Sequence, residues 1–173
     1  FDDLEFKVLR DRLFSTLAAP EPEAEEGFEV RGAALEPGTV RAWLAEHGAS
    51  GDRHGLSVVG SPSPYDGDAT AIAIASPDGE GAYVSTSTLT PEDEQALAAW
   101  LADPDQPKAL HEAKWAMHAL RGRGWTLAGV TSDTALAAYL VRPGQRTFAL
   151  DDLSLRYLKR ELRVEDTGQQ QLS

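Results

Sequence analysis

With 173 residues, of which 42% are hydrophobic, the chain has the size of one ordinary domain with a core of its own. It contains no cysteine, which excludes disulfides and thiolate metal sites, and no apolar run approaches the ~18 residues that a membrane span needs. We therefore expect a soluble cytoplasmic protein, since the acidic first residues are also unlike a signal peptide. Its net charge of −12 disfavours binding to a phosphate backbone and predicts weak or no DNA binding by the isolated domain.

The N-terminal 27 residues are expected to lie outside the main domain. Residues 4–14 have a helical spacing of apolar side chains, with Leu9 and Leu13 one turn apart. The following stretch AAPEPEAEEG has prolines and glutamates but no large apolar residue, which predicts a linker. We therefore expect a terminal helix (1–17), a linker (18–27), a main domain (28–163) and a polar, disordered tail (164–173).

The main domain begins with an α/β pattern. Residues 38–46 predict a short helix with one apolar face that ends at Gly48. Three runs, residues 56–59, 69–75 and 82–85, predict strands, and Pro77-Asp78-Gly79 predicts a tight turn between the second and the third. Three consecutive strands with short connections indicate an antiparallel meander.

Helices dominate the second half. Thr90-Pro91-Glu92-Asp93 predicts a helix start, because a hydroxyl cap precedes proline and two acids. A strand is expected over 108–111, and a helix over 113–121 with Ala113, Met117 and Leu120 buried. An extended piece over 125–130 and a helix capped by Asp133 follow. The last expected helix is capped by Asp151 or Asp152 and has Leu155, Leu158 and Leu162 inward. A meander followed by alternating helices and short strands is the outline of a ribonuclease H-like fold.

Four stretches, in this order, resemble the bacterial DNA polymerase I family. Residues 4–14 resemble the helix that ends its 5′-nuclease region, and residues 35–44 (LEPGTVRAWL) the entry helix of its 3′→5′ exonuclease domain. Residues 132–140 (SDTALAAYL) are similar to its Asp-Thr-x-Leu-x-x-Tyr-x-Leu stretch, and residues 151–155 (DDLSL) to the next helix. Twelve Arg against four Lys suggest a GC-rich, actinobacterial-type source.

The resemblance implies a DnaQ-like exonuclease domain, whose active members bind two metal ions through carboxylates. The family places Asp-x-Glu at the end of the first strand and Asn-x-x-x-Asp at the start of a later helix. Here Gly60 and Pro62 take the first pair of positions, and Glu112 and Ala116 the second. The third motif, Tyr-x-x-x-Asp, is expected beyond Leu162, outside the chain. We therefore expect this fragment to hold no catalytic residue, metal or cofactor.

The function that the resemblance implies is structural. We expect an inactive spacer between the 5′-nuclease and polymerase modules of a DNA-directed DNA polymerase that acts in replication and repair. The parent would bind DNA and would need Mg²⁺ at its polymerase and 5′-nuclease sites, whereas this fragment would contact the two modules. The alternatives are an active exonuclease that uses displaced acids (Glu112, Asp66 or Asp68) and an unrelated protein-interaction module.

Other polar residues favour structural interpretations. Asp66 and Asp68 flank Gly67 but lack the further donors of a calcium loop, so a turn is favoured. The basic face that Lys114, His118, Arg121 and Arg123 could form is expected to be solvated rather than bound to DNA. Structural roles are expected for His47, His54, His111 and His118, and core or interdomain packing for Trp43, Trp100, Trp115 and Trp125.

Overall fold

The computed structural model describes residues 31–63 and 65–158. The chain divides into two compact units, residues 29–150 and residues 1–28 together with 151–173. The expected N-terminal helix, the linker and the C-terminal tail lie outside the described residues. Within the described residues, no helix is both long and apolar enough to cross a membrane.

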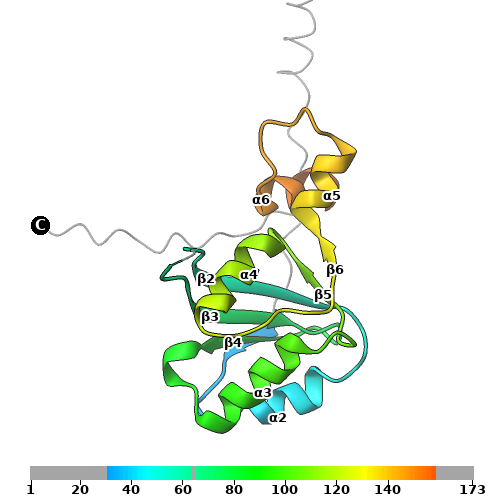
Figure 1. Ribbon diagram of the computed structural model, residues 1–173. Helices are drawn as coiled ribbons and strands as arrows, with labels where there is room; N and C mark the ends of the chain where they lie inside the picture. The colour runs from blue at the N-terminus through cyan, green and yellow to red at the C-terminus, as the bar shows by residue number, and fades with distance from the viewer. Residues whose placement is uncertain (1–30, 64, 159–173) are drawn as a thin grey trace, which may run out of the picture. The chain divides into compact units, whose positions relative to one another are not determined.

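A mixed sheet with the strand order β1-β4-β3-β2-β5-β6 forms the larger unit (Figure 1). The meander is confirmed, because β2 pairs antiparallel with β3 and β3 antiparallel with β4. The outer strands extend it in parallel, β1 on β4, β5 on β2 and β6 on β5. The bounds are Arg31–Ala34 (β1), His54–Ser61 (β2), Asp68–Ala75 (β3), Glu80–Ser85 (β4), Lys108–Leu110 (β5) and Val130–Asp133 (β6).

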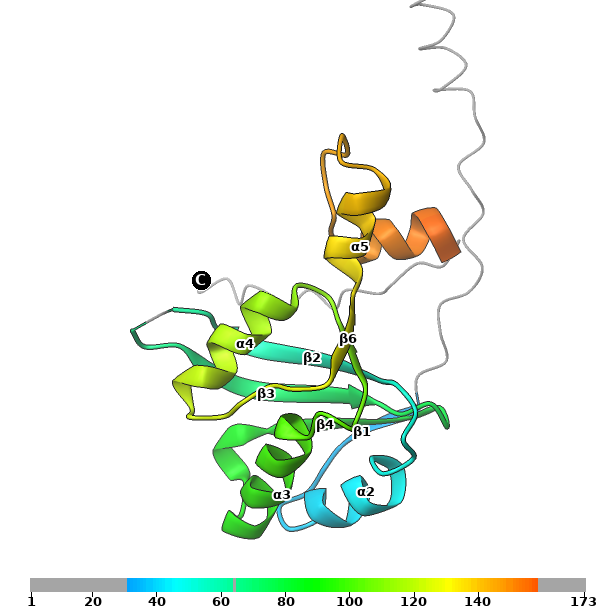
Figure 2. The ribbon, with the colours of Figure 1, turned by 45° about the vertical axis from the view of Figure 1, so that its right-hand side comes forward.

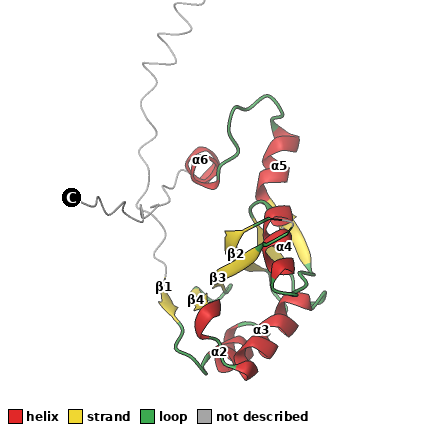
Figure 3. Ribbon diagram, turned by 60° about the vertical axis from the view of Figure 1, so that its left-hand side comes forward, coloured by secondary structure: helices red, strands yellow, loops and turns green. Residues whose placement is uncertain are grey.

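Three helices pack with the meander around one core: α2 (Val40–His47), α3 (Pro91–Ala102) and α4 (Ala113–Gly122). They lie along one side of the strands in Figure 3, and a 3₁₀ turn, Thr86–Thr88, leads from β4 towards α3. Alternating residues of the strands, such as Leu56 and Val58, meet Leu97, Leu101 and Leu120 of the helices. The side chains of the other alternation therefore point to the opposite face of the sheet.

Two buried polar side chains, Asp93 and Lys108, link separate segments around this core. Thr90 caps α3 as predicted, accepting a hydrogen bond from the Asp93 N–H at 3.2 Å. The buried Asp93 carboxylate accepts in turn from the Gly38 and Arg41 N–H groups, at 2.6 and 3.2 Å, and so binds the start of α2 to α3. The buried Lys108 ammonium donates to three backbone carbonyls and lies 4.7 Å from the Trp100 ring centroid.

The strand predictions need one correction. β1 was not predicted, because RGAA has no β-branched or aromatic residue; it pairs with the edge that β4 offers. The segment over 125–130, predicted as an extended piece, joins the sheet only at Val130, where β6 begins. Before Val130 the segment makes isolated backbone hydrogen bonds instead of a ladder. The Ala128 N–H donates to the Leu101 carbonyl, and the Gly129 carbonyl accepts from the Lys108 N–H.

The helix predictions also need corrections. Met117 is 39% exposed, and α4 buries Ala116 and Ala119 instead, whose small side chains allow the helix to lie close to the sheet. The last helix, α6 (Leu150–Leu153), begins before Asp151, so neither Asp151 nor Asp152 is its cap. It continues as a π-helical turn, Ser154–Leu158, and this change of winding leaves Leu158 exposed and Leu155 half-buried. Leu162 lies outside the described residues.

Candidate functional site

The end of β2 carries the first pair of predicted site positions. A bulge separates Val59 from Gly60, and Gly60 then pairs with Ala69 and Ser61 with Asp68. The Gly60 backbone has φ 157°, and a Cβ placed there would overlap the Asp68 carbonyl oxygen and lie 2.9 Å from the Ala69 Cα. Both neighbours are backbone atoms of the paired strand, so they cannot rotate away. Gly60 therefore occupies a position where a side chain does not fit.

An ion pair joins the start of β3, which ends the loop after β2, to the residue that follows α4. Asp68 accepts from the Arg123 guanidinium at 3.0 Å, and Arg123 also lies 5.1 Å from the Trp125 ring centroid. Pro62 and Asp66 are both exposed in this loop. Of the acids that we considered as displaced ligands, Asp68 thus neutralises an arginine and Asp66 lies in a surface turn.

The second pair of positions lies at the start of α4. Glu112 is the N-cap residue and has φ 60° and ψ 57°; among the described residues it is the only non-glycine with positive φ. Its side chain is exposed, whereas Ala116, one turn into the helix, is 3% exposed and packs in the core with Val58. Of the four predicted site positions (Gly60, Pro62, Glu112 and Ala116), Glu112 alone carries a carboxylate.

Asp133 is a structural carboxylate whose role the sequence predicts only in part. It caps α5 (Thr134–Val141) as predicted, accepting from the Ala135 and Leu136 N–H groups at 3.0 and 3.3 Å. It also accepts from the Ala113 and Glu112 N–H groups, at 2.8 and 3.1 Å, at the start of α4. Burial alone would raise the pKa of Asp133, but these four donors outweigh it and lower the pKa.

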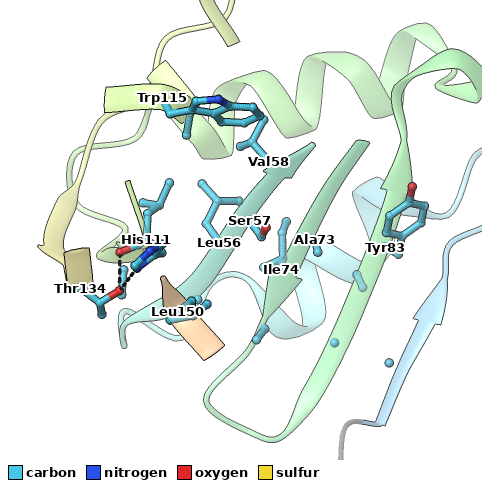
Figure 4. Close-up of a pocket in the computed structure, with 18 of the residues that line it drawn as sticks. Leu56, Ser57, Val58, Ala73, Ile74, Tyr83, His111, Trp115, Thr134 and Leu150 are labelled. Atoms are coloured by element: carbon cyan, nitrogen blue, oxygen red, sulfur yellow. Dashed lines mark hydrogen bonds between the residues drawn. The ribbon is translucent and has the colours of Figure 1, made fainter. Parts of the chain in front are cut away.

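An apolar depression of about 500 Å³ lies over the sheet, and Ala116 is the one predicted site position among its lining residues (Figure 4). Its floor includes Ser57, Ala73 and Tyr83, which are neighbours across β2, β3 and β4 on the face opposite the core. At one end His111 Nδ1 lies 2.9 Å from the Thr134 hydroxyl. The remaining lining residues are Gly32, Ala33, Ala34, Gly55, Leu56, Val58, Ile74, Ala75, Gly81, Ala82, Ala109, Leu110, Trp115, Ala116 and Leu150.

The chemistry of this region does not fit a pair of divalent cations. Mg²⁺ needs several oxygen ligands, chiefly carboxylates. No Asp, Glu, Lys or Arg lines the depression. Nowhere in the part of the chain that the structure describes do three or more His, Cys, Asp or Glu side chains gather as a metal site would require. Ser57, Tyr83, His111 and Thr134 are the polar side chains available there.

Three of the four histidines lie within hydrogen-bond distance of other groups of the fold, and two of the four residues of the expected basic face are exposed. His54 is fully buried, and its ring nitrogens lie 2.9 and 2.7 Å from the Asp52 and His47 carbonyls. His47 pairs with Asp78 at 2.7 Å. On α4, Lys114 and Arg121 are exposed and His118 is half-buried. Trp100 and Trp125 are buried, and Trp43 and Trp115 pack against the core.

Comparison with known proteins gives a consistent assignment. Residues 63–167 match the family described as "DNA polymerase I, ribonuclease H-like domain". The chain is 74% identical over 174 residues to DNA polymerase I of Mycobacterium tuberculosis and 67% identical over 176 residues to that of Mycobacterium leprae. Each match covers 100% of this chain and 19% of the relative, so the chain spans about a fifth of these proteins.

Solved structures agree with this assignment. The POL domain of Pol1 from M. smegmatis, in complex with DNA primer-template and dNTP, is 71% identical with a TM-score of 0.72; the match covers 77% of this chain and 23% of that one. Escherichia coli RNase D, an exoribonuclease, has a TM-score of 0.59 at 19% identity over 76% of this chain and 34% of its own, which shows a shared fold alone. The fold is thus the expected ribonuclease H-like exonuclease fold, and the chain belongs to the DNA polymerase I family, of which it contains the ribonuclease H-like domain.

Proposed function

We propose that the chain is a catalytically inactive 3′→5′ exonuclease-like domain that spaces the 5′-nuclease and polymerase modules of a cytoplasmic DNA polymerase I. The parent would be a DNA-directed DNA polymerase that acts in replication and repair, with Mg²⁺ at its polymerase and 5′-nuclease sites. The relatives named DNA polymerase I and the M. smegmatis POL domain support this parentage. The chain's small share of their length means that the polymerase chemistry would lie outside it.

The observation that carries the inactivity is the geometry of Gly60. Two-metal hydrolysis needs carboxylates that hold both ions and position the attacking water. At the strand end where the family places them, the backbone of β3 fills the space that any side chain of residue 60 would need. The Pro62 side chain has no oxygen that could bind a metal ion, and Ala116 is an apolar residue in the core. Glu112 alone would bind Mg²⁺ weakly, because hard cations take several oxygen ligands.

The distribution of charge favours a spacer domain over an enzyme that acts on nucleic acid. The depression, whose lining includes Ala116, has no cationic side chain to meet a phosphate, and the chain as a whole carries a charge of −12. Arg123, the residue that follows α4, is paired with Asp68. We therefore propose that the domain alone binds DNA weakly or not at all, and that DNA contacts belong to the parent's other modules.

A nuclease assay tests the proposal. The 173-residue chain, in molar excess, is incubated with 5′-labelled single-stranded DNA and Mg²⁺ or Mn²⁺, beside Glu112→Ala, Asp66→Ala and Asp68→Ala variants and an EDTA control. We expect no shortening of the DNA from its 3′ end in any arm. Metal-dependent shortening that any of the three substitutions abolishes would establish the alternative, an exonuclease with displaced acids. Shortening that is equal in all variants would indicate a contaminating nuclease, because the variants differ at the candidate ligands.

A further inference from the structure

His54 is a fully buried histidine at a junction of helices and strands inside the larger unit. It begins β2, where it pairs with Lys108, the first residue of β5. Its Nε2 atom lies 2.7 Å from the His47 carbonyl oxygen at the end of α2, and its ring meets the Trp100 ring of α3 edge-on, with 5.6 Å between the centroids. Figure 2 shows α2 and α3 side by side. His54 therefore links both helices to the sheet.

The other ring nitrogen of His54 has two competing neighbours. Nδ1 lies 2.9 Å from the Asp52 carbonyl oxygen, which can only accept, and 3.0 Å from Nε2 of the buried Gln106 amide, which can only donate. Nδ1 accepts when it has no proton and donates when it has one. The protonation state of His54 therefore decides which of the two neighbours it binds.

The hydrogen-bond inventory assigns the neutral form. Nε2 faces a carbonyl and so carries the single ring proton. The Gln106 amide then places its two hydrogens on two acceptors, His54 Nδ1 and the Asp52 carbonyl, the latter at 3.1 Å. Turning the amide by 180° would bring its oxygen against the Asp52 carbonyl oxygen instead. In the neutral form His54 and Gln106 are therefore fully partnered at these atoms.

The charged groups around His54 do not compete for Nδ1. The buried Lys108 ammonium lies over the same Trp100 ring, but its donors go to three backbone carbonyls. His47 pairs with Asp78 through its own ring. The remaining titratable side chains on the adjoining loops are exposed, namely Asp52, Arg53, Asp103 and Asp105.

We propose that His54 is a proton-controlled switch for the loop over residues 103–107. In the neutral form Nδ1 holds the Gln106 amide. A proton taken up from solvent at Nδ1 turns that nitrogen into a donor, which keeps a partner in the Asp52 carbonyl but repels the Gln106 N–H. The cost of protonation thus falls on Gln106, which loses a buried hydrogen bond.

The effect should reach β5 and the segment before β6. The Asp103 and Gln106 carbonyls of the loop accept from the Lys108 ammonium. The same loop lies so close to Gly129 that a Cβ there would overlap the Gln106 carbonyl oxygen. Because the Lys108 N–H donates to the Gly129 carbonyl, loosening of the loop should also weaken the entry into β5.

Ring nitrogen–hydrogen correlation spectra of the isotope-labelled 173-residue chain test the assignment. With the His54 signals assigned through its backbone, we expect a proton on Nε2 and none on Nδ1 at neutral pH. This measurement uses the parent sequence, so it decides even where a variant fails to fold.

Amide exchange tests the release of the loop. The Lys108 and Ala128 N–H groups donate to the Gly129 and Leu101 carbonyls. Over the pH interval in which Nδ1 gains its proton, the protection of these two amides should fall at least about ten-fold, after correction for the intrinsic pH dependence of exchange. Loss of one buried hydrogen bond corresponds to roughly this factor. Ile72, in the middle of β3, should keep its protection.

A matched pair of variants isolates Gln106. In Gln106→Glu the amide donor becomes a carboxylate oxygen that accepts, so we expect both His54 ring nitrogens to be protonated at neutral pH and the pH step in exchange to disappear. Gln95→Glu makes the same change at an exposed position of α3 and should behave as the parent sequence.

Several results would overturn the proposal. In the parent sequence these are a proton on Nδ1 at neutral pH, a His54 that stays neutral until the chain unfolds, and exchange that does not follow Nδ1. Equal effects of Gln106→Glu and Gln95→Glu would make the change one of net charge. Loss of the step in Asp78→Asn would place the titrating group at His47.

Discussion

Substitution of Gly60 by alanine tests whether the end of β2 can accept any side chain. The added Cβ would overlap the Asp68 carbonyl oxygen and lie 2.9 Å from the Asp68 carbonyl carbon and from the Ala69 Cα. Overpacking against backbone costs about 1–3 kcal/mol, and a rarely populated backbone conformation adds about 1–3 kcal/mol. We expect Gly60→Ala to lower the free energy of unfolding by about 2–6 kcal/mol, which corresponds to roughly 6–18 °C in Tm.

Two other glycines separate the two contributions. Gly124 has φ 76°, and a Cβ added there would have no neighbouring atom within 4 Å, so Gly124→Ala tests the backbone cost alone, about 1–2 kcal/mol. Gly144 has equally open surroundings and no positive φ, so Gly144→Ala should be close to neutral. Thermal and urea unfolding of the three variants should rank Gly60 as the most sensitive position, then Gly124, then Gly144.

The refuting result is a Gly60→Ala variant no less stable than Gly124→Ala. The bulge would then relax at little cost, and a carboxylate could also stand at residue 60. Steric exclusion would no longer support an inactive site, and the proposal would rest on residue identity alone. A large loss of stability, by contrast, predicts that Gly60→Asp cannot restore a metal ligand without rebuilding the pairing of β2 with β3.

Two further predictions concern buried and paired charges. Lys108→Met removes the donor to the Asp103, Gln106 and Ala128 carbonyls and should cost about 2–5 kcal/mol in urea unfolding; a variant at least as stable as the parent sequence would contradict this. The hydrogen bond with Asp78 raises the pKa of His47 and lowers that of Asp78 to about 2, so Asp78→Asn should destabilise most between about pH 4 and 6.5. The difference in Tm between Asp78→Asn and the parent sequence should shrink as pH rises through the raised pKa of His47, or as pH falls towards the pKa of Asp78. A Tm difference that does not depend on pH would rule out the His47–Asp78 pair as its source.

The sequence by itself determined the elements whose signals are local. A hydroxyl or carboxylate cap lies within three residues of the N–H groups that it binds, so Thr90 and Asp133 could be identified as caps without tertiary information. The meander followed from runs of β-forming residues joined by a short turn. Residue identity at the positions predicted for the motifs likewise sufficed to place no carboxylate at Gly60, Pro62 and Ala116.

Only the tertiary structure decided the features that depend on contacts between distant segments. The second role of Asp133 joins residues 20 and 21 positions apart, and the Asp68–Arg123 pair joins residues 55 apart. β1 forms because β4 offers an unpaired edge, which its own sequence does not encode. The same holds for Gly60: no sequence pattern indicates that the β3 backbone excludes a side chain there, because this follows from what surrounds the residue in space.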